Sequence, residues 1–282
     1  MNSAIFILTY GRANNVKTLD TLLKGGYKLS DIYFVVSDDD KQLQQYIDNF
    51  GKQVVVFSKE DAREITDLCD NFENRKIVVF ARNYAFKIAK ELELDCFCVV
   101  DDDYSGLVYR RCFGEKLKGF KVKNIKQIND ACFNYLMNTP NLDCFAFAQN
   151  GDFIGGADSF ESIGGKRKIM NYYFFKTNKP IRFLGSLNED LTASVYEGQR
   201  GKCFFTINDV SVQQIMTQAN KGGLTDVYLD SGTYVKSFYS VIAAPNCVKV
   251  SAMGNNDLRI HHKVNWNLAC PKIIREEIKN GK

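Results

Sequence analysis

Three consecutive carboxylates, Asp101, Asp102 and Asp103, follow a continuous apolar segment at residues 96–100. Adjacent carboxylates repel one another unless a cation compensates their charge. Hard divalent cations do this well, because Mg²⁺ is held by one or two carboxylates together with substrate phosphates, and Mn²⁺ prefers similar ligands. The alternative is a solvated acidic turn that caps a helix. The apolar strand in front of the triplet favours the metal site.

A second acidic triplet, Asp38, Asp39 and Asp40, also follows an apolar segment, but the next residues begin a predicted helix. Carboxylates at that position cap free backbone N–H groups and favour the positive end of the helix. The functional alternative is that Asp38 contacts the base or ribose of a nucleotide.

Two further segments carry groups that suit a nucleotide. Thr9, Tyr10, Gly11 and Arg12 follow the first apolar segment. Glycine lets the backbone approach a ligand closely, arginine holds phosphate and tyrosine stacks on a base. Arg82 precedes a predicted helix, and we expect it either to reach a phosphate or to pair with the acidic cluster.

Later in the chain, Asn188, Glu189 and Asp190 form a second acidic site at the start of a predicted helix. Asp190 is our candidate general base for removing a hydroxyl proton, and Glu189 is the alternate. Both could instead cap the helix. His261 and His262 are the only histidines; adjacent strand residues point to opposite faces, so we expect one of them to be a third metal ligand.

Basic and aromatic residues are mixed in three segments. Such mixtures grip phosphates and stack bases, but they are equally typical of a solvated face or of core aromatics flanked by surface lysines. Lys221-Gly222-Gly223 is one more candidate loop in which the backbone could approach a ligand closely. The three mixed segments are 109–111, 118–126 and 166–176.

Apolar segments and helix-period segments alternate in the first half of the chain, which predicts an α/β fold with a mainly parallel sheet and helices on both faces. Ligands bind at the carboxyl ends of such strands. We expect one domain, 1–282, with a nucleotide-binding half at 1–105 and a mixed, acceptor-binding and catalytic half at 106–282. The predicted strands are 5–9, 32–36, 54–57, 96–100, 145–148, 203–207 and 247–252, and the predicted helices are 15–24, 40–50, 83–92, 125–138 and 188–196.

Composition excludes several protein classes. Apolar residues make up 45% and charged residues 25% of the 282, which is ordinary for a globular protein and excludes long disorder. The net charge of +4 permits a local basic face without requiring one. Nine cysteines include no CxxC pair, so we expect buried thiols in a reducing compartment. No signal segment or membrane span is apparent, and we expect a cytoplasmic protein.

The ordered set of motifs resembles the GT-A-fold glycosyltransferases. That set is the loop 9–12, Asp38, Arg82, the acidic triplet after a strand, Glu189-Asp190 and a late histidine. More narrowly, the chain resembles the TET/JBP-associated glycosyltransferases of phages and base J systems. The stretches that carry this resemblance are 101–104, 151–156, 188–190, 228–234 and 259–263.

The resemblance implies a metal-dependent transfer of a sugar from a nucleotide sugar, expected to be a UDP-sugar, to a hydroxymethyl-pyrimidine in DNA. Thr9, Tyr10, Arg12, Asp38, Arg82, Asp101 and Asp102 would bind the donor. Asp101, Asp103 and His261 or His262 would hold Mn²⁺ or Mg²⁺, and the reaction would invert the anomeric carbon, with retention left open. A phage-encoded protein would act in the host cytoplasm. The alternatives are a protein, lipid or glycan acceptor, a nucleotidyltransferase, and a binding module without activity.

Overall fold

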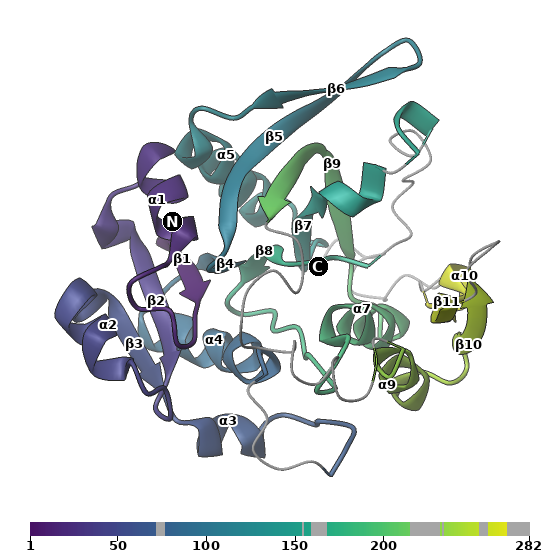
Figure 1. The fold of residues 1–282 in the computed structure, drawn as a ribbon, viewed down its shortest axis with the longest axis horizontal. Coiled ribbons are helices and arrows are strands. Elements are labelled where there is room, and N and C mark those ends of the chain that lie inside the picture. Colours follow the sequence, from purple (N-terminus) through teal and green to yellow (C-terminus); the bar gives the residue numbers. More distant parts are fainter. Residues whose placement is uncertain are drawn as a thin grey trace.

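A nine-stranded sheet runs through the protein in the order β3-β2-β1-β4-β8-β7-β9-β5-β6, and a separate two-stranded hairpin joins β10 to β11 (Figure 1). The computed structural model describes residues 1–71, 77–153, 155–158, 168–214, 232, 234–253 and 259–269. The strands are β1 (Ser3–Leu8), β2 (Ile32–Ser37), β3 (Val54–Phe57), β4 (Cys96–Asp101), β5 (Tyr104–Phe113), β6 (Lys116–Lys121), β7 (Cys144–Gln149), β8 (Tyr172–Lys176), β9 (Phe204–Gln214), β10 (Val248–Met253) and β11 (Arg259–Val264).

Helices cover both faces of the sheet, with α1 and α5 on one side and α3 and α4 on the other (Figure 1). The α-helices are α1 (Lys17–Lys24), α2 (Leu43–Phe50), α3 (Lys59–Glu64), α4 (Val79–Glu91), α5 (Ile125–Met137), α7 (Glu189–Gln199), α9 (Lys236–Ala243) and α10 (Trp266–Ala269). Short 3-10 turns are η1 (Leu29–Asp31), η2 (Gly51–Gln53) and η3 (Asn150–Phe153).

The first half of the sheet is parallel, as the alternation of segments predicts. β1 pairs in parallel with β2 and with β4, and β2 pairs in parallel with β3. Ile5, Phe6 and Ile7 of β1 are all fully buried, because helices cover both faces of this strand. The α/β prediction is therefore confirmed.

The second half is mixed. β8 lies antiparallel between β4 and β7, whereas β7 and β9 are parallel, and β5 and β6 add two antiparallel pairings at the edge. The chain therefore passes from β4 through a two-residue turn at Asp102 and Asp103 to a strand on the far side of β9. Strands from both predicted halves share one sheet.

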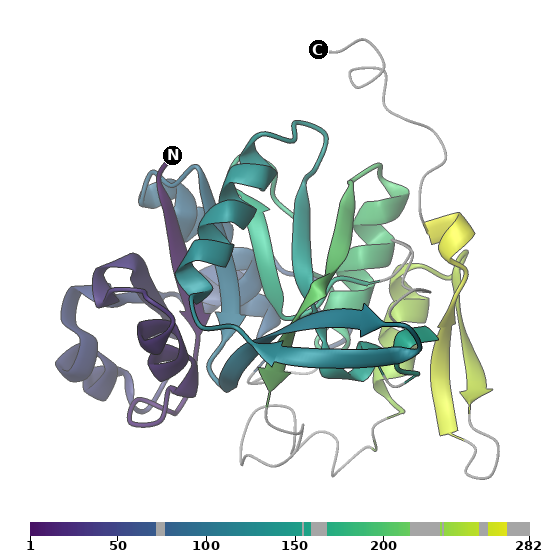
Figure 2. The same cartoon turned by 90° about the horizontal axis from the view of Figure 1, so that it is seen from above.

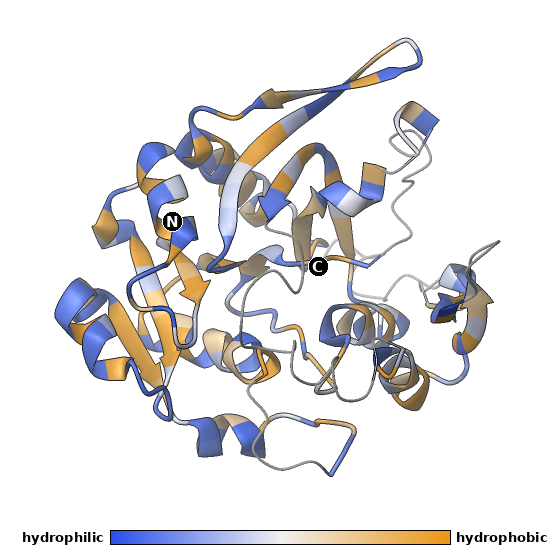
Figure 3. Ribbon diagram, in the orientation of Figure 1, coloured by the Kyte–Doolittle hydropathy of each residue, from blue (hydrophilic) through white to orange (hydrophobic). Residues whose placement is uncertain are grey.

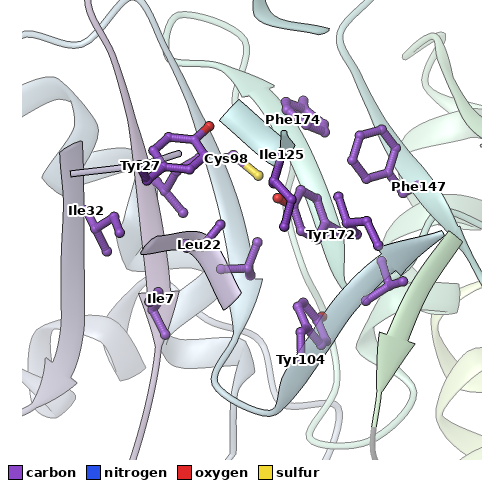
Figure 4. Close-up of a cluster of buried hydrophobic side chains, with 14 of the residues drawn as sticks. Ile7, Leu22, Tyr27, Ile32, Cys98, Tyr104, Ile125, Phe147, Tyr172 and Phe174 are labelled. Carbon is purple, nitrogen blue, oxygen red and sulfur yellow. The ribbon is translucent and has the colours of Figure 1, made fainter. Parts of the chain in front are cut away.

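Two apolar cores lie on the two faces of the sheet. Figure 4 shows the first, where Leu22 of α1 and Ile125 of α5 pack against the strand residues Ile7, Cys98 and Phe174. The second packs α3, α4 and α7 against the opposite face. A smaller cluster joins α7 to α9, β10 and α10.

The strand β8 corrects one expectation. Residues 172–175 belong to a mixed basic and aromatic segment for which nucleic-acid contact was one alternative, but Tyr172, Tyr173, Phe174 and Phe175 are buried in the sheet. They are core aromatics, because β4 and β7 flank this strand on both edges. Lys166 and Arg167 of the same segment lie outside the described residues.

Two further strand features differ from the sequence predictions. The β5–β6 hairpin was not predicted, and β9 continues well beyond the expected strand 203–207. Five of the eight cysteines described are buried. Among the helices of the described residues, none has the length and hydropathy of a membrane span.

Candidate active site

The loop after β1 and the acidic triplet after β4 lie side by side, because β1 and β4 are adjacent parallel strands that pair Leu8 with Asp101. The Thr9 hydroxyl donates to Asp102 Oδ2 at 2.7 Å and also bonds the Tyr46 hydroxyl at 2.7 Å. The Arg12 guanidinium forms an ion pair with Asp102. Thr9 and Asp102 are thus engaged inside the protein, where they fix the loop against the turn.

Thr18 in α1 holds the backbone of the triplet from the other side. Its hydroxyl donates to the Asp101 carbonyl at 2.6 Å and accepts the N–H of Tyr104 at 2.9 Å. The Tyr104 hydroxyl in turn lies 3.2 Å from Asp101 Oδ2. The turn is therefore bound at its start and at its end, which keeps its carboxylates in place.

Asp103 has the least satisfied carboxylate of the triplet. Its Oδ1 is buried and has no hydrogen-bond partner among the residues that the structure describes. Burial and the neighbouring Asp102 raise the pKa of Asp103, and burial likewise raises the pKa of Asp101 despite the Arg82 guanidinium, with Asp103 adding to the rise. Two nearby carboxylates whose pKa values are both raised by burial and by a neighbouring carboxylate fit a divalent cation bound by oxygen ligands.

A pocket of ≈ 290 Å³ opens beside Asp103. Its lining includes Gly11, Arg12, Lys17 and Gln42 together with Asp102 and Asp103. Two cationic side chains and a backbone with a glycine at φ +67° suit a phosphate group, since glycine adopts this conformation without strain. The volume is near the lower end for small-molecule sites.

The second triplet has divided roles. Asp40 is buried, and its carboxylate accepts the N–H of Gly11 at 2.6 Å and that of Gln42 at 2.8 Å. Asp39 pairs with Lys59, and Asp38 accepts the N–H of Lys59 at 3.1 Å. Asp40 therefore ties the loop after β1 to the residue that precedes α2, and none of the described side chains caps the first turn of α2. Asp38 is exposed at the end of β2.

Arg82 connects the triplet to the second acidic site. It is 3% exposed in the first turns of α4, where its Nη2 lies 3.5 Å from Asp101 Oδ1 and its Nη1 donates to Glu189. Burial would lower the pKa of Arg82, but Tyr173, Glu189 and Asp101 around it raise that pKa instead. Of the two alternatives for Arg82, these contacts support pairing with the acidic cluster.

The residues at the start of α7 have distinct environments. Asn188 adopts a left-handed conformation at φ 59°, which asparagine tolerates better than most residues. Burial raises the pKa of Glu189 against the effect of Arg82. Asp190 lies 2.8 Å from Lys168 Nζ, and this ammonium outweighs burial and lowers the pKa of Asp190.

The two histidines lie on β11, next to α7 rather than next to β4. His262 Nδ1 is 3.3 Å from Asn188 Nδ2, and burial and neighbouring cations lower the pKa of His262 to about 4. Figures 1 and 2 place the β10–β11 hairpin beyond α7, on the side away from β1 to β3. In the described part of the chain, no three His, Cys, Asp or Glu side chains gather as a metal site. A histidine ligand for the metal of Asp101 and Asp103 stays a prediction.

Some predicted residues cannot be placed, and some important ones were missed. Lys221 to Gly223, Tyr228 to Ser231 and Ile154 lie outside the described residues. Tyr46 was not singled out, and Asp40 and Lys168 were considered only as members of the second acidic triplet and of the segment 166–176. Tyr46 accepts the N–H of Arg12 at 2.8 Å. The one sequence signal for it is its position on the apolar face of α2, which indicates a buried side chain.

Comparisons with known proteins find solved structures of similar fold. The fold is similar to that of a mannosyltransferase from Pyrobaculum calidifontis, solved with GDP-Man and Mn²⁺, with a TM-score of 0.50, 10% identity and coverage of 86% of this chain and 73% of that one. Glucosyl-3-phosphoglycerate synthase from Mycobacterium tuberculosis, solved with Mn²⁺, UDP and phosphoglyceric acid, gives a TM-score of 0.49 at 10% identity, over 100% and 91% of the two chains. No curated protein matches the sequence.

The mixed sheet, with an acidic turn after β4, defines a GT-A-type glycosyltransferase fold. The chain belongs to the TET-associated glycosyltransferase family, whose model matches residues 3–223. The protein is therefore a glycosyltransferase, and the expected family is confirmed.

Proposed function

We propose that the protein transfers a sugar from a nucleotide sugar, a UDP-sugar, to the hydroxymethyl group of a pyrimidine in DNA. The observation that carries the donor side is the buried Oδ1 of Asp103, which has no hydrogen-bond partner among the described residues and lies beside the pocket that Arg12 and Lys17 line. A diphosphate bound in this pocket would contact two cationic side chains, and a divalent cation would neutralise its remaining negative charge.

Asp101 and Asp103 would hold Mn²⁺ or Mg²⁺ in this arrangement, with His261 or His262 as the predicted third protein ligand. Bound there, the metal would neutralise the charge that develops on the diphosphate leaving group. The mannosyltransferase of similar fold was solved with a nucleotide sugar and Mn²⁺, which is the ligand class that we propose for this chain.

The nucleoside of the donor would lie toward the loop after β1 and the end of β2. Tyr10 is only partly buried, and Asp38 is exposed at that edge, so their side chains are accessible to a base or a ribose. Asp40 and Tyr46 hold the backbone of Gly11 and Arg12 beneath them. The loop is therefore shaped before the donor binds, which lowers the entropic cost of binding.

Asp190 would act as the general base on the acceptor. The acceptor O–H proton passes to the Asp190 carboxylate, the oxygen forms a bond to the anomeric carbon, and the bond from that carbon to the diphosphate breaks. The nucleoside diphosphate leaves, and attack from the opposite face inverts the configuration. Lys168 keeps Asp190 ionised, so the base is ready at neutral pH, although its lowered pKa makes it a weak proton acceptor until the pair separates.

Glu189 has a different part in this scheme. Its carboxylate is committed to Arg82, which also contacts Asp101. The structure therefore supports Asp190 over Glu189 as the base, with Glu189 and Arg82 setting the position of α7 relative to the triplet.

One assay tests donor and acceptor together. Purified protein is incubated with Mn²⁺, a panel of nucleotide sugars and DNA that contains hydroxymethylcytosine, and the digested nucleosides are analysed by mass spectrometry. We expect a mass gain of one sugar on the modified nucleoside, with release of nucleoside diphosphate. Release of pyrophosphate would indicate a nucleotidyltransferase. Metal-dependent hydrolysis of the donor without any gain on DNA would indicate a protein, lipid or glycan acceptor.

A further inference from the structure

The β5–β6 hairpin concentrates the positive charge of the protein. Residues 104–124 contain six lysines and arginines against the single acid Glu115, a net charge of +5, whereas the whole chain carries +4. The remainder of the chain therefore sums to −1. Lys116, Lys118, Lys121 and Lys123 are all exposed. This segment is the basic face that the modest overall charge permits.

Strand register gives the hairpin one face of alternating aromatic and basic residues. Tyr109 is opposite Phe120, Arg111 is opposite Lys118, and Phe113 is opposite Lys116. Because side chains of a strand alternate between faces, these six side chains share one face. Figure 3 shows hydrophilic and hydrophobic stretches following one another along the hairpin ribbon. We call these six residues the hairpin platform.

Two features of the hairpin platform disfavour the folded state of the isolated protein. Like charges directly opposite one another on neighbouring strands destabilise a sheet, and Arg111 lies opposite Lys118. An exposed ion pair between Arg111 and Asp209 offsets part of this repulsion. Phe113 and Phe120 are 56% and 48% exposed, although their rings contact each other edge to face with centroids 6.2 Å apart. Exposed aromatics between cations suit a ligand that has both phosphates and flat rings.

Edge-strand protection explains part of this composition. Lysines on an edge strand such as β6 discourage pairing with another chain. That function needs charge alone, however, and exposed phenylalanines on the same face would work against it. The aromatic half of the platform therefore requires a different explanation.

The opposite face of the hairpin is anchored to the body of the protein. Arg110 Nε donates to Ser211 at 2.8 Å, its Nη2 donates to Asn150 at 2.8 Å, and its guanidinium lies over the Phe153 ring. Gly119 leaves room for Val108, since a Cβ at residue 119 would lie 2.8 Å from the Val108 side chain. These contacts fix the position of the platform. The hairpin crosses the other strands of the main sheet at a steep angle (Figure 2).

We propose that the hairpin platform is a nucleic-acid-binding arm that grips the acceptor DNA away from the base that receives the sugar. Arg111, Lys116 and Lys118 would contact phosphates, and Phe113 and Phe120 would stack on unpaired bases or pack against sugars. β5 starts directly after Asp103, and the eight residues from there to Arg111 span roughly 26 Å at the usual strand rise. That reach corresponds to about eight base steps of DNA. The inference rests on the proposed DNA acceptor.

Binding is measured first, without any chemistry. Fluorescence anisotropy with unmodified DNA of about 30 base pairs, and with single strands of that length, compares wild type with Arg111→Gln/Lys118→Gln. We expect about tenfold weaker binding and a salt slope reduced by about two, one per lost phosphate contact. The matched control is Lys52→Gln/Lys90→Gln, which removes two exposed lysines, one in η2 and one in the last turn of α4, and should bind like wild type.

A second variant tests the aromatic half and identifies the form of DNA. Phe113→Leu/Phe120→Leu keeps all charges, and we expect it to weaken single-stranded binding more than duplex binding, since unpaired bases offer faces for stacking. Equal affinity of both variants and wild type for both DNA forms would overturn the proposal. Equal loss in the control variant, or full displacement of the DNA by polyglutamate at the same concentration of charge, would show a nonspecific cationic surface and also overturn it.

Transfer assays separate this inference from the proposed function. With long hydroxymethylated DNA, Arg111→Gln/Lys118→Gln should raise KM about tenfold with kcat unchanged, whereas a modified oligonucleotide of about four bases, too short to reach the arm, should show no difference. If DNA is glycosylated and the variant has wild-type KM on long DNA, the arm is wrong while the function stands. If no DNA is glycosylated but platform-dependent DNA binding persists, the proposed acceptor chemistry fails while the arm stands.

Discussion

Arg82 Nη2 lies 3.5 Å from Asp101 Oδ1, in a part of α4 where the arginine side chain is almost completely buried. The same guanidinium donates to Glu189, 107 residues later in the chain. A single buried cation thus couples the acidic turn of the proposed donor site to the helix that carries the proposed base. The rings of Tyr173 and Phe183 flank it, with centroids 5.2 and 5.7 Å from the guanidinium carbon.

Replacing Arg82 should damage both stability and transfer. Arg82→Met leaves Asp101 and Glu189 buried without their counter-charge, which costs about 3–5 kcal/mol in comparable cases. We expect a lower midpoint in urea unfolding and a transfer rate at least about a hundredfold lower.

The double variant Arg82→Met/Glu189→Gln separates the two effects. This variant removes the Glu189 charge that Arg82→Met leaves unpaired, so part of the lost folding stability should return. Transfer should stay low, because Asp101 still lacks the Arg82 guanidinium. Wild-type transfer by a folded Arg82→Met protein would show that the bridge has no role in the reaction.

Asp101 and Asp103 should be required for metal-dependent transfer. Asp101→Asn and Asp103→Asn each remove a proposed ligand charge, and we expect activity to fall about a hundredfold or more and to need higher Mn²⁺ for half-maximal rate. Asp39→Asn, in the other acidic triplet, is the matched control and should behave as wild type.

The same Mn²⁺ titration tests the histidines. A raised Mn²⁺ requirement in either His261→Asn or His262→Asn would establish the predicted third ligand. An unchanged requirement in both would limit the protein ligands to the carboxylates. Full transfer by Asp103→Asn would refute the proposed donor site.

The Lys168–Asp190 pair should set the acid limb of the pH–rate profile. The pKa of Asp190 is lowered because the effect of Lys168 exceeds that of burial, so the wild-type base stays ionised until well below its usual pKa. In Lys168→Gln the Asp190 carboxylate keeps its burial but loses its nearest cation, so the pKa of Asp190 should rise. We expect the acid limb of kcat/KM to move to higher pH, with activity at neutral pH the least affected.

The pair also contributes to stability with a definite sign. A carboxyl group whose pKa is lowered by folding stabilises the protein above its unfolded pKa, and this contribution is lost as pH falls through the folded value. Lys168→Gln should therefore flatten the loss of stability on acidification. An acid limb at the same pH in both proteins would exclude Asp190 as the titrating base.

Asp40 should affect donor binding more than the chemical step. Its carboxylate accepts the N–H groups of Gly11 and Gln42, so Asp40→Ala leaves one donor in the loop after β1 and one before α2 without their acceptor. We expect a stability loss of about 1–3 kcal/mol and a raised KM for the nucleotide sugar. Calorimetric titration with the nucleoside diphosphate measures the donor side directly.

Tyr46→Phe is the graded companion of that variant. It removes only the hydroxyl that accepts the Arg12 N–H and bonds Thr9, so it should raise KM in the same direction by a smaller factor. Unchanged donor affinity in both variants would show that the loop after β1 does not bind the nucleotide.

Local sequence was sufficient for the first half of the fold. The apolar segments of β1 to β4 are continuous because helices cover both faces of those strands, and this pattern is visible without any partner strand. The ends of parallel strands meet at one edge, so the proximity of Thr9, Arg12 and Asp102 could be expected. The hairpin 104–121 was missed, although Gly114 between two alternating segments is the signal that could have indicated it.

Tertiary structure decided what chemically similar residues do. Both acidic triplets follow buried strands. Among the described residues, only the triplet after β4 has a buried carboxylate oxygen without a partner, whereas Asp40 in the triplet after β2 binds backbone N–H groups. Residues 172–175 and the hairpin platform are both aromatic and basic mixtures. β4 and β7 bury the former, whereas the latter lies at the sheet edge. Residue type and spacing determine which local element forms, but the role of a charge or a ring depends on its burial and its partners, which come from segments far away in the chain.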